Sequence, residues 1–147
     1  MQMALAQVIF IAAALLVGTV FMHYEALRFA AGISDRSSSP NRTDILKVIG
    51  ILLCVHFAEI ALYAGVLSLC QHFHLGALAG QVEGGAIDWL YFSLSSYTTL
   101  GVGDVHPRGP LRLIAGVEAL NGLVLIGWSA SFTYLTMERV WKEPSTP

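Results

Sequence analysis

The chain carries, between two long apolar runs, the segment Tyr97-Thr98-Thr99-Leu100-Gly101-Val102-Gly103-Asp104. Within it, Gly101 and Gly103 alternate with apolar residues behind a pair of threonines. Glycine adopts left-handed backbone angles without a steric penalty, so this spacing allows successive carbonyl groups to point toward a common axis. A file of carbonyl oxygens, with the Thr99 hydroxyl below it, can replace the hydration shell of a small cation. The segment therefore predicts a cation site built mainly from backbone.

The composition is typical of a membrane protein. Of the 147 residues, 55% are apolar and 12% are charged, whereas roughly a quarter of the residues in soluble domains are charged. The net charge of -2 and the absence of a basic cluster give no indication of a nucleic-acid partner. A lipid bilayer is the predicted environment.

Three apolar runs are long enough to cross a hydrocarbon core of roughly 30 Å. They are Met3 to Met22, Ile45 to Cys70 and Leu111 to Met137. The first could instead be a cleaved signal peptide, but no Lys or Arg precedes it and no clear cleavage site ends it. We therefore expect a transmembrane helix there as well.

A shorter apolar segment precedes the glycines. Asp88 is placed to cap a helix over Trp89 to Tyr97, which is too short to cross a bilayer. Irregular backbone at membrane depth is tolerated only where it is buried in protein or lines water. A half-helix leading into a re-entrant loop is the expected arrangement.

These residues resemble a known family. Thr98-Thr99-Leu100-Gly101-Val102-Gly103-Asp104 is similar to the selectivity-filter signature of potassium channels, usually Thr-Val-Gly-Tyr-Gly-Asp, and the resemblance extends from about Asp88 to Ser131. It implies an all-α membrane protein with three transmembrane helices, a re-entrant pore helix and a selectivity filter. Because one chain supplies one side of such a filter, it also implies a homotetramer. The implied ion-binding residues are Thr99, Leu100, Gly101, Val102 and Gly103, with potassium ions as the bound species.

The resemblance divides the chain into parts. The expected parts are an extra N-terminal transmembrane helix (1–28), a cytoplasmic loop (29–43), a pore module (44–137) and a cytoplasmic tail (138–147). Within the pore module we expect an outer helix (45–70), a pore helix (88–97), the filter (98–104) and an inner helix (111–137).

Four residues are expected to support the filter: Thr98, Asp104, Ser95 and Glu118. Val102 replaces the aromatic residue that holds the filter width in relatives, and Ser95 occupies a position where some relatives place a glutamate. Glu118 lies inside the third crossing, where a charge is expensive and usually functional. We expect it to hydrogen-bond Ser95 or Ser96 behind the filter. A pairing with Asn121 in a helix interface is the alternative.

The third crossing contains a candidate cavity and gate. Gly122 matches the hinge glycine of the resembled family, and either a hinge or close helix packing explains it. By the same match, an apolar cavity able to gate by dewetting is expected. Its residues are Gly122, Leu123, Ile126, Ala130 and Tyr134.

Two other polar groups remain. His56 and Glu59 share one face of the second crossing. Two ligands on one helix are a weak match for a metal site, so we favour a polar pair that meets the first crossing or Glu118. The histidines of the outer loops could sense pH, although simple solvation explains them: His72, His74 and His106.

Loop charges predict the orientation. Lys and Arg lie between the first two crossings and in the tail, which places both in the cytoplasm and the N-terminus and filter mouth outside. Minimal loops suit a prokaryotic inner membrane, and any regulatory partner would be a separate protein. The predicted activity is passive potassium conduction without enzymatic chemistry or a cofactor. The rivals are a weakly selective cation channel, a non-conducting subunit, and an intramembrane metal enzyme using His56, Glu59 and Glu118.

Overall fold

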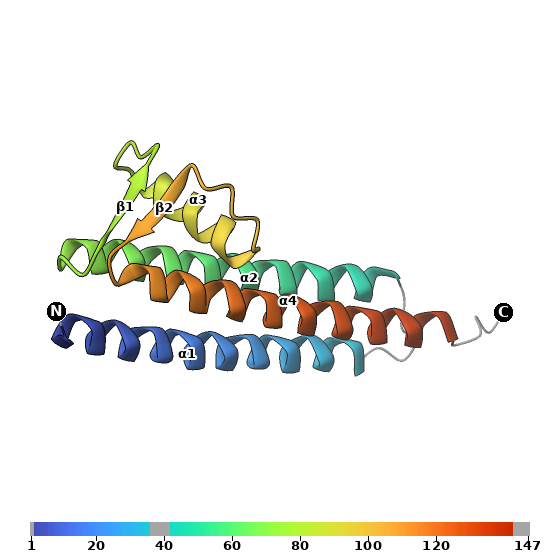
Figure 1. The fold of residues 1–147 in the computed structure, drawn as a ribbon. Coiled ribbons are helices and arrows are strands. Elements are labelled where there is room, and N and C mark those ends of the chain that lie inside the picture. The colour runs from blue at the N-terminus through green and yellow to red at the C-terminus, as the bar shows by residue number, and fades with distance from the viewer. Residues whose placement is uncertain (1, 36–41, 143–147) are drawn as a thin grey trace.

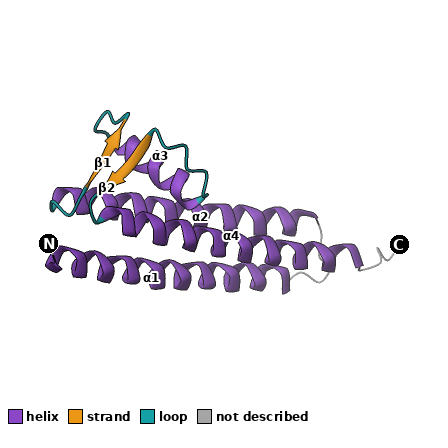
Figure 2. Cartoon of the chain, in the orientation of Figure 1, coloured by secondary structure: helices purple, strands orange, loops and turns teal. Residues whose placement is uncertain are grey.

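A computed structural model describes residues 2–35 and 42–142. Helices dominate it, and the only strands in the described ranges form a small two-stranded antiparallel sheet (Figure 2). We call this pair the hairpin, although residues 81–104 lie between its strands. In chain order the elements are α1 (Gln2–Asp35), α2 (Arg42–His72), β1 (Ala77–Gly80), α3 (Ala86–Tyr97), β2 (Val105–Arg108) and α4 (Leu111–Lys142).

Helices α1, α2 and α4 form a bundle of long, nearly parallel rods (Figure 1). They have 34, 31 and 32 residues, so at about 1.5 Å per residue each is longer than a hydrocarbon core of roughly 30 Å. These three helices in the described part of the chain are apolar enough to cross a membrane. The predicted all-helical membrane architecture is confirmed.

Several predicted boundaries were wrong, because falling hydropathy marks the end of the membrane and not of the helix. Helix α1 continues to Asp35 instead of ending at 28, and α4 continues to Lys142 instead of 137. A charged pair lies within the extension of α4, where Lys142 donates to Glu138 over 2.5 Å. In α1 the corresponding pair, Arg28 donating to Glu25 over 3.1 Å, lies just before the extension.

The other boundaries shift by smaller amounts. Helix α2 spans Arg42–His72 where 45–70 was expected, and α3 begins at Ala86 rather than at 88. What remains of the predicted loop at 29–43 is 36–41, which lies outside the described residues, as does 143–147 of the tail.

The hairpin was not predicted. Strands β1 and β2 pair antiparallel, with Ala77 opposite Arg108 and Gly80 opposite Val105. The hairpin lies with α3 on one side of α2 and α4, and α1 lies on the other side (Figure 1). It therefore connects the segment before the pore helix to the segment after the filter.

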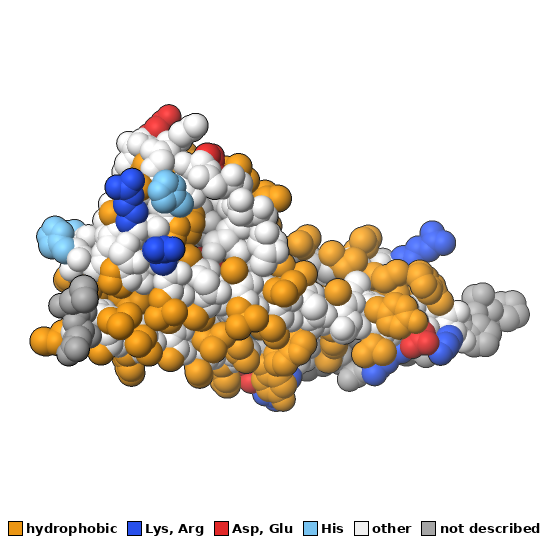
Figure 3. Space-filling view, viewed as in Figure 1, with side chains coloured by type: hydrophobic (Ala, Val, Ile, Leu, Met, Phe, Trp, Pro, Cys, Tyr) orange, Lys and Arg blue, Asp and Glu red, His pale blue; other side chains and the backbone are white. Residues whose placement is uncertain are grey.

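The core of the bundle has three levels. A large apolar cluster at the hairpin end includes Val8, Leu67 and Ile114, and a smaller one toward the other end includes Ala30 and Val48. Between them lie buried polar side chains: Thr19, His23, Glu59, Glu118, Asn121 and Ser129. Apolar side chains cover much of the outer surface of the long helices, as expected for a lipid-facing surface (Figure 3).

Candidate functional site

Helix α3 positions the glycine segment. Its third residue, Asp88, accepts hydrogen bonds from the backbone N–H groups of Gly84 at 2.7 Å and Gly85 at 3.2 Å, which fixes the start of the helix. The helix ends after 12 residues at Tyr97. Thr98 follows as its C-cap, and its hydroxyl donates to the Leu94 carbonyl over 2.7 Å. The chain therefore leaves the helix well short of a full crossing.

The segment after α3 has the predicted alternation of backbone angles. Thr99, Gly101 and Gly103 have φ values of 59°, 57° and 88°. Glycine takes such angles freely, but for a β-branched residue such as Thr99 they are a genuine outlier. Strain of this kind persists only where the surrounding structure enforces it, and it clusters at functional sites.

One residue of the helix holds this backbone in place. The Ser95 carbonyl accepts hydrogen bonds from the N–H groups of Leu100 at 2.9 Å and Gly101 at 3.3 Å, and the Ser95 hydroxyl lies 3.4 Å from the N–H of Val102. The donors of the segment therefore point back toward α3. Ser95 acts through its own backbone and hydroxyl, so of the two serines predicted to contact Glu118 it is not the one that does.

The carbonyl groups of the segment remain available. Within the described residues, no hydrogen bond ends on the carbonyl oxygens of 99–103. Leu100 and Val102 are 71% and 55% exposed in a single chain. An unpaired polar backbone at membrane depth must lie against protein, water or ions.

A tyrosine that sequence reasoning missed holds the outer end of the segment. The Tyr91 hydroxyl lies 2.9 and 3.1 Å from the two carboxylate oxygens of Asp104, and donates to that group. This hydrogen bond raises the pKa of Tyr91 above its ordinary value of 10.0. The Asp104 carbonyl in turn accepts from the Gln81 N–H at 2.9 Å, so the hairpin side also fixes this end.

Glu118 contacts two serines of α3, the predicted Ser96 and also Ser93, which was not predicted. It is fully buried in α4, and the Ser93 hydroxyl also lies 2.8 Å from the Ile60 carbonyl. The alternative pairing with Asn121 is wrong, because the Asn121 amide donates to Thr19 at 2.7 Å and to Tyr63. Glu118 therefore joins α4 to the back of α3 and to α2.

Gly122 is a site of close approach. A Cβ at this position would lie 2.1 Å from the Tyr97 carbonyl oxygen, so α4 can contact the end of α3 only through a glycine. This favours the packing explanation of Gly122. Of the other cavity residues, Ile126, Ala130 and Tyr134 line one cavity of about 580 Å³ together with Tyr97, while Leu123 is exposed on α4 outside its lining.

His56 and Glu59 meet the first crossing. The Glu59 carboxylate lies 3.1 Å from Nδ1 of His23 in α1, and both side chains are fully buried. The expected polar pair contacting the first crossing is confirmed, and Glu118 is not part of this group. His23 was missed because the predicted apolar run ended at Met22. Its spacing from Thr19, one helical turn earlier, could have indicated a polar face on α1.

The histidines at the hairpin end are exposed side chains. They are His72 at the end of α2, His74 after it and His106 in β2. Their exposure agrees with the expectation of simple solvation.

The arrangement as a whole is that of a pore-lining loop. A short helix packs against one side of a bundle of membrane-spanning helices, and the loop after it carries unpaired carbonyls on alternating backbone angles. A family model described as an ion channel matches residues 55–139, which is more than half of the chain. The chain belongs to the ion channel family. It is a multi-pass membrane protein, and the resemblance to the pore domain of potassium channels is confirmed.

A curated relative supports the same assignment. Two-pore potassium channel 1 of Arabidopsis thaliana is 35% identical over 69 residues, which are 46% of this chain and 19% of the relative. The chain thus spans about a fifth of that protein's length. No solved structure matches the chain.

Proposed function

We propose that four copies of this chain form a passive, potassium-selective pore. The observation that carries the proposal is the 99–103 backbone, whose φ values alternate in sign. The N–H groups of 100–102 donate back to Ser95, while the carbonyl oxygens of the described segment accept no hydrogen bond. Carbonyl oxygens arranged in this way can replace the hydration shell of potassium. The Thr99 hydroxyl would add a ligand at the inner end.

The exposure of the filter supports a tetramer. The polar 99–103 backbone is uncovered in a single chain, and this is unfavourable at membrane depth. Four copies around one axis would cover it and surround an ion with carbonyl oxygens. Helix α3 would then direct its C-terminal end, which carries a partial negative charge, toward the cavity below the filter. The curated relative is named a potassium channel, which supports potassium as the conducted ion.

The distribution of charge supports the proposed orientation. Arg28, Lys47 and Lys142 belong to helix ends far from the hairpin, whereas α1 begins at the hairpin end (Figure 1). By the positive-inside rule, the hairpin and the N-terminus face outward and the other end faces the cytoplasm. A bacterial inner membrane fits such a compact chain.

A weakly selective cation pore is the second candidate, and Val102 favours it. Its side chain has no polar group and is more than half exposed, so within one chain it does not brace the filter. Reversal potentials measured with potassium on one side and sodium on the other separate the two candidates. A shift corresponding to at least tenfold preference for potassium supports the proposal, and a shift near zero supports the weakly selective pore.

Substitution of Gly101 tests the filter itself. Gly101→Ala places a Cβ on a residue with φ of 57°, which costs on the order of 1–2 kcal/mol per chain. That strain is repeated four times around one axis. Potassium flux from liposomes containing purified protein should fall at least tenfold, and the flux that barium blocks should disappear.

Gly65→Ala is the matched control. Gly65 lies in α2, and a Cβ there meets no atom within 4 Å, so flux should stay at the wild-type level. Wild-type flux and barium block in Gly101→Ala would refute the assignment of 99–103 as the ion pathway. A monomer or dimer in lipid would refute the tetramer.

A further inference from the structure

The buried polar layer contains a cluster to which all four helices contribute. His23 comes from α1, His56 and Glu59 from α2, Tyr97 from α3 and Ser129 from α4. His23 and Glu59 are fully buried, and His56 is 14% exposed. Such groups inside a membrane bundle are costly unless they bind one another or a ligand.

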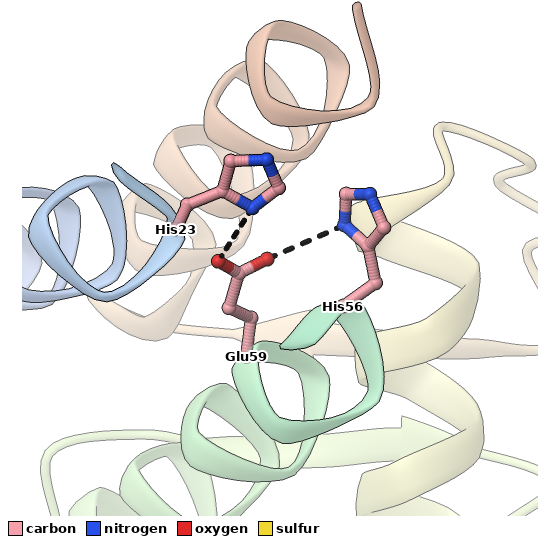
Figure 4. Close-up of side chains that lie close together, drawn as sticks. All are labelled: His23, His56 and Glu59. Carbon is pink, nitrogen blue, oxygen red and sulfur yellow. Dashed lines mark hydrogen bonds and ion pairs between the residues drawn. The ribbon is translucent and has the colours of Figure 1, made fainter. Parts of the chain in front are cut away.

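The two imidazole rings turn the same nitrogen toward one carboxylate (Figure 4). Nδ1 of His23 lies 3.1 Å from one oxygen of Glu59, and Nδ1 of His56 lies 3.3 Å from the other. The three side chains offer ligand atoms that all lie within 4.8 Å of one another. Two imidazoles and one carboxylate are the donor set of many zinc sites.

The opposite side of each ring is held by one hydroxyl. Ser129 Oγ lies 3.2 Å from Nε2 of His23 and 2.9 Å from Nε2 of His56. If both Nδ1 atoms bind a metal, both Nε2 atoms carry hydrogens, and a hydroxyl oxygen has two lone pairs to accept them. Metal-binding histidines are usually oriented by such a second hydrogen bond.

Without a bound cation the cluster has fewer hydrogens than hydrogen-bond contacts. Tyr97 Oη lies 2.5 Å from Glu59 and 2.8 Å from Nδ1 of His56, which completes a ring of five contacts. A carboxylate and two neutral imidazoles leave one hydrogen each on His23, His56, Tyr97 and Ser129, fewer than the contacts. All five contacts are therefore satisfied only if the ring takes up one cation, either a proton or a metal ion.

We propose that His23, His56 and Glu59 bind a divalent transition-metal ion of the zinc class. The nitrogen donors favour zinc over calcium or magnesium, which prefer oxygen. The Tyr97 phenol is placed beside the fourth position. His56, Tyr97 and Ser129 line the cavity of about 580 Å³ between α2, α3 and α4, which gives an ion a route to the site.

The site would act on the pore through Tyr97. This residue is the last of α3, directly before the filter, and its carbonyl lies against Gly122. A metal held by α1 and α2 at the Tyr97 hydroxyl would fix the inner end of the filter. The matched family region, 55–139, does not include His23, so this site gives α1 a role that the pore module alone does not supply.

Zinc binding to the full chain in lipid nanodiscs tests the proposal. Metal-stripped protein is titrated with zinc against a chromogenic chelator, and cobalt is used in parallel because a tetrahedral site with nitrogen donors gives it an intense visible absorption. We expect one zinc per chain. Affinity should fall at least about 100-fold in His23→Gln and by roughly 10- to 100-fold in Ser129→Ala, which removes only the hydroxyl that orients the rings.

His106→Gln is the control, because His106 is an exposed histidine of the hairpin, and it should bind like wild type. Size-exclusion profiles identify variants that fail to assemble. If His23→Gln is one of them, Ser129→Ala still tests the site, because it keeps all three ligands. The proposal is overturned if wild type binds no stoichiometric zinc, or if His106→Gln loses as much binding as His23→Gln. If the chain binds no zinc and its potassium flux depends on pH, the cation held by the ring is a proton and the metal proposal is wrong. Potassium flux of metal-free protein is measured separately and bears only on the pore.

Discussion

The contact between Gly122 and the end of the pore helix gives the sharpest prediction about stability. In Gly122→Ala the new Cβ would lie 2.1 Å from the Tyr97 carbonyl oxygen and 2.9 Å from the Tyr97 carbonyl carbon. Both atoms belong to backbone, so no side-chain rotation relieves the clash. Helices α3 and α4 must separate by about 1.3 Å to reach an ordinary contact of 3.4 Å.

The expected magnitude follows from two opposing effects. Overpacking of a tight contact costs about 1–3 kcal/mol, and a backbone contact belongs in the upper part of that range. Alanine gains about 1 kcal/mol over glycine in a helix. We therefore expect Gly122→Ala to lower the free energy of unfolding by about 2 kcal/mol. The displaced Tyr97 would also move Thr98 at the base of the filter, so flux should fall as well.

Gly127→Ala is the control on the same helix, because a Cβ there meets no atom within 4 Å. Thermal unfolding in detergent is measured for both variants beside potassium flux. Gly122→Ala should unfold at a lower temperature than wild type and Gly127→Ala should not. If Gly122→Ala unfolds like wild type and only its opening changes, the glycine is a hinge and the close-packing argument is refuted.

Three further predictions concern the supports of the filter. Tyr91→Phe removes the hydrogen bond to Asp104 and should make potassium currents decline faster during sustained conduction; an unchanged time course would contradict this support. Because the hydrogen bond raises the pKa of Tyr91, the neutral phenol persists below pH 10.0 and is lost as pH rises through the raised value. Currents of wild type, but not of Tyr91→Phe, should therefore change only in alkaline solution. Glu118→Leu removes the buried partner of Ser93 and should cost about 1–3 kcal/mol of unfolding free energy. Glu118→Gln keeps a hydrogen-bonding group and should cost clearly less, and equal losses in the two variants would show that the hydrogen bond is unimportant.

The polar layer explains why sequence reasoning reached only part of the site. The pairing of His56 with Glu59 follows from helical spacing, and so does their need for a partner inside the membrane. The identity of that partner does not follow, because His23 and Glu59 lie on different helices. Glu118 is similar: its burial was expected, but which of the neighbouring serines it meets depends on how α4 rotates against α3.

Local chemistry determined much of this protein. Long uncharged runs can bury their backbone only as helices in a bilayer, and the alternation of Gly101 and Gly103 permits only a few backbone paths. The membrane class, the three crossings, the short pore helix and the left-handed glycines were therefore readable from the residues alone.

Only the tertiary structure decided the contacts between segments far apart in the chain. It placed β1 beside β2, Tyr91 against Asp104, Tyr97 against Gly122, and His23 beside Glu59. The physical reason is that each such contact depends on the rotation and offset of two packed elements. Those are set by the fit of many side chains at once and not by the spacing within either segment.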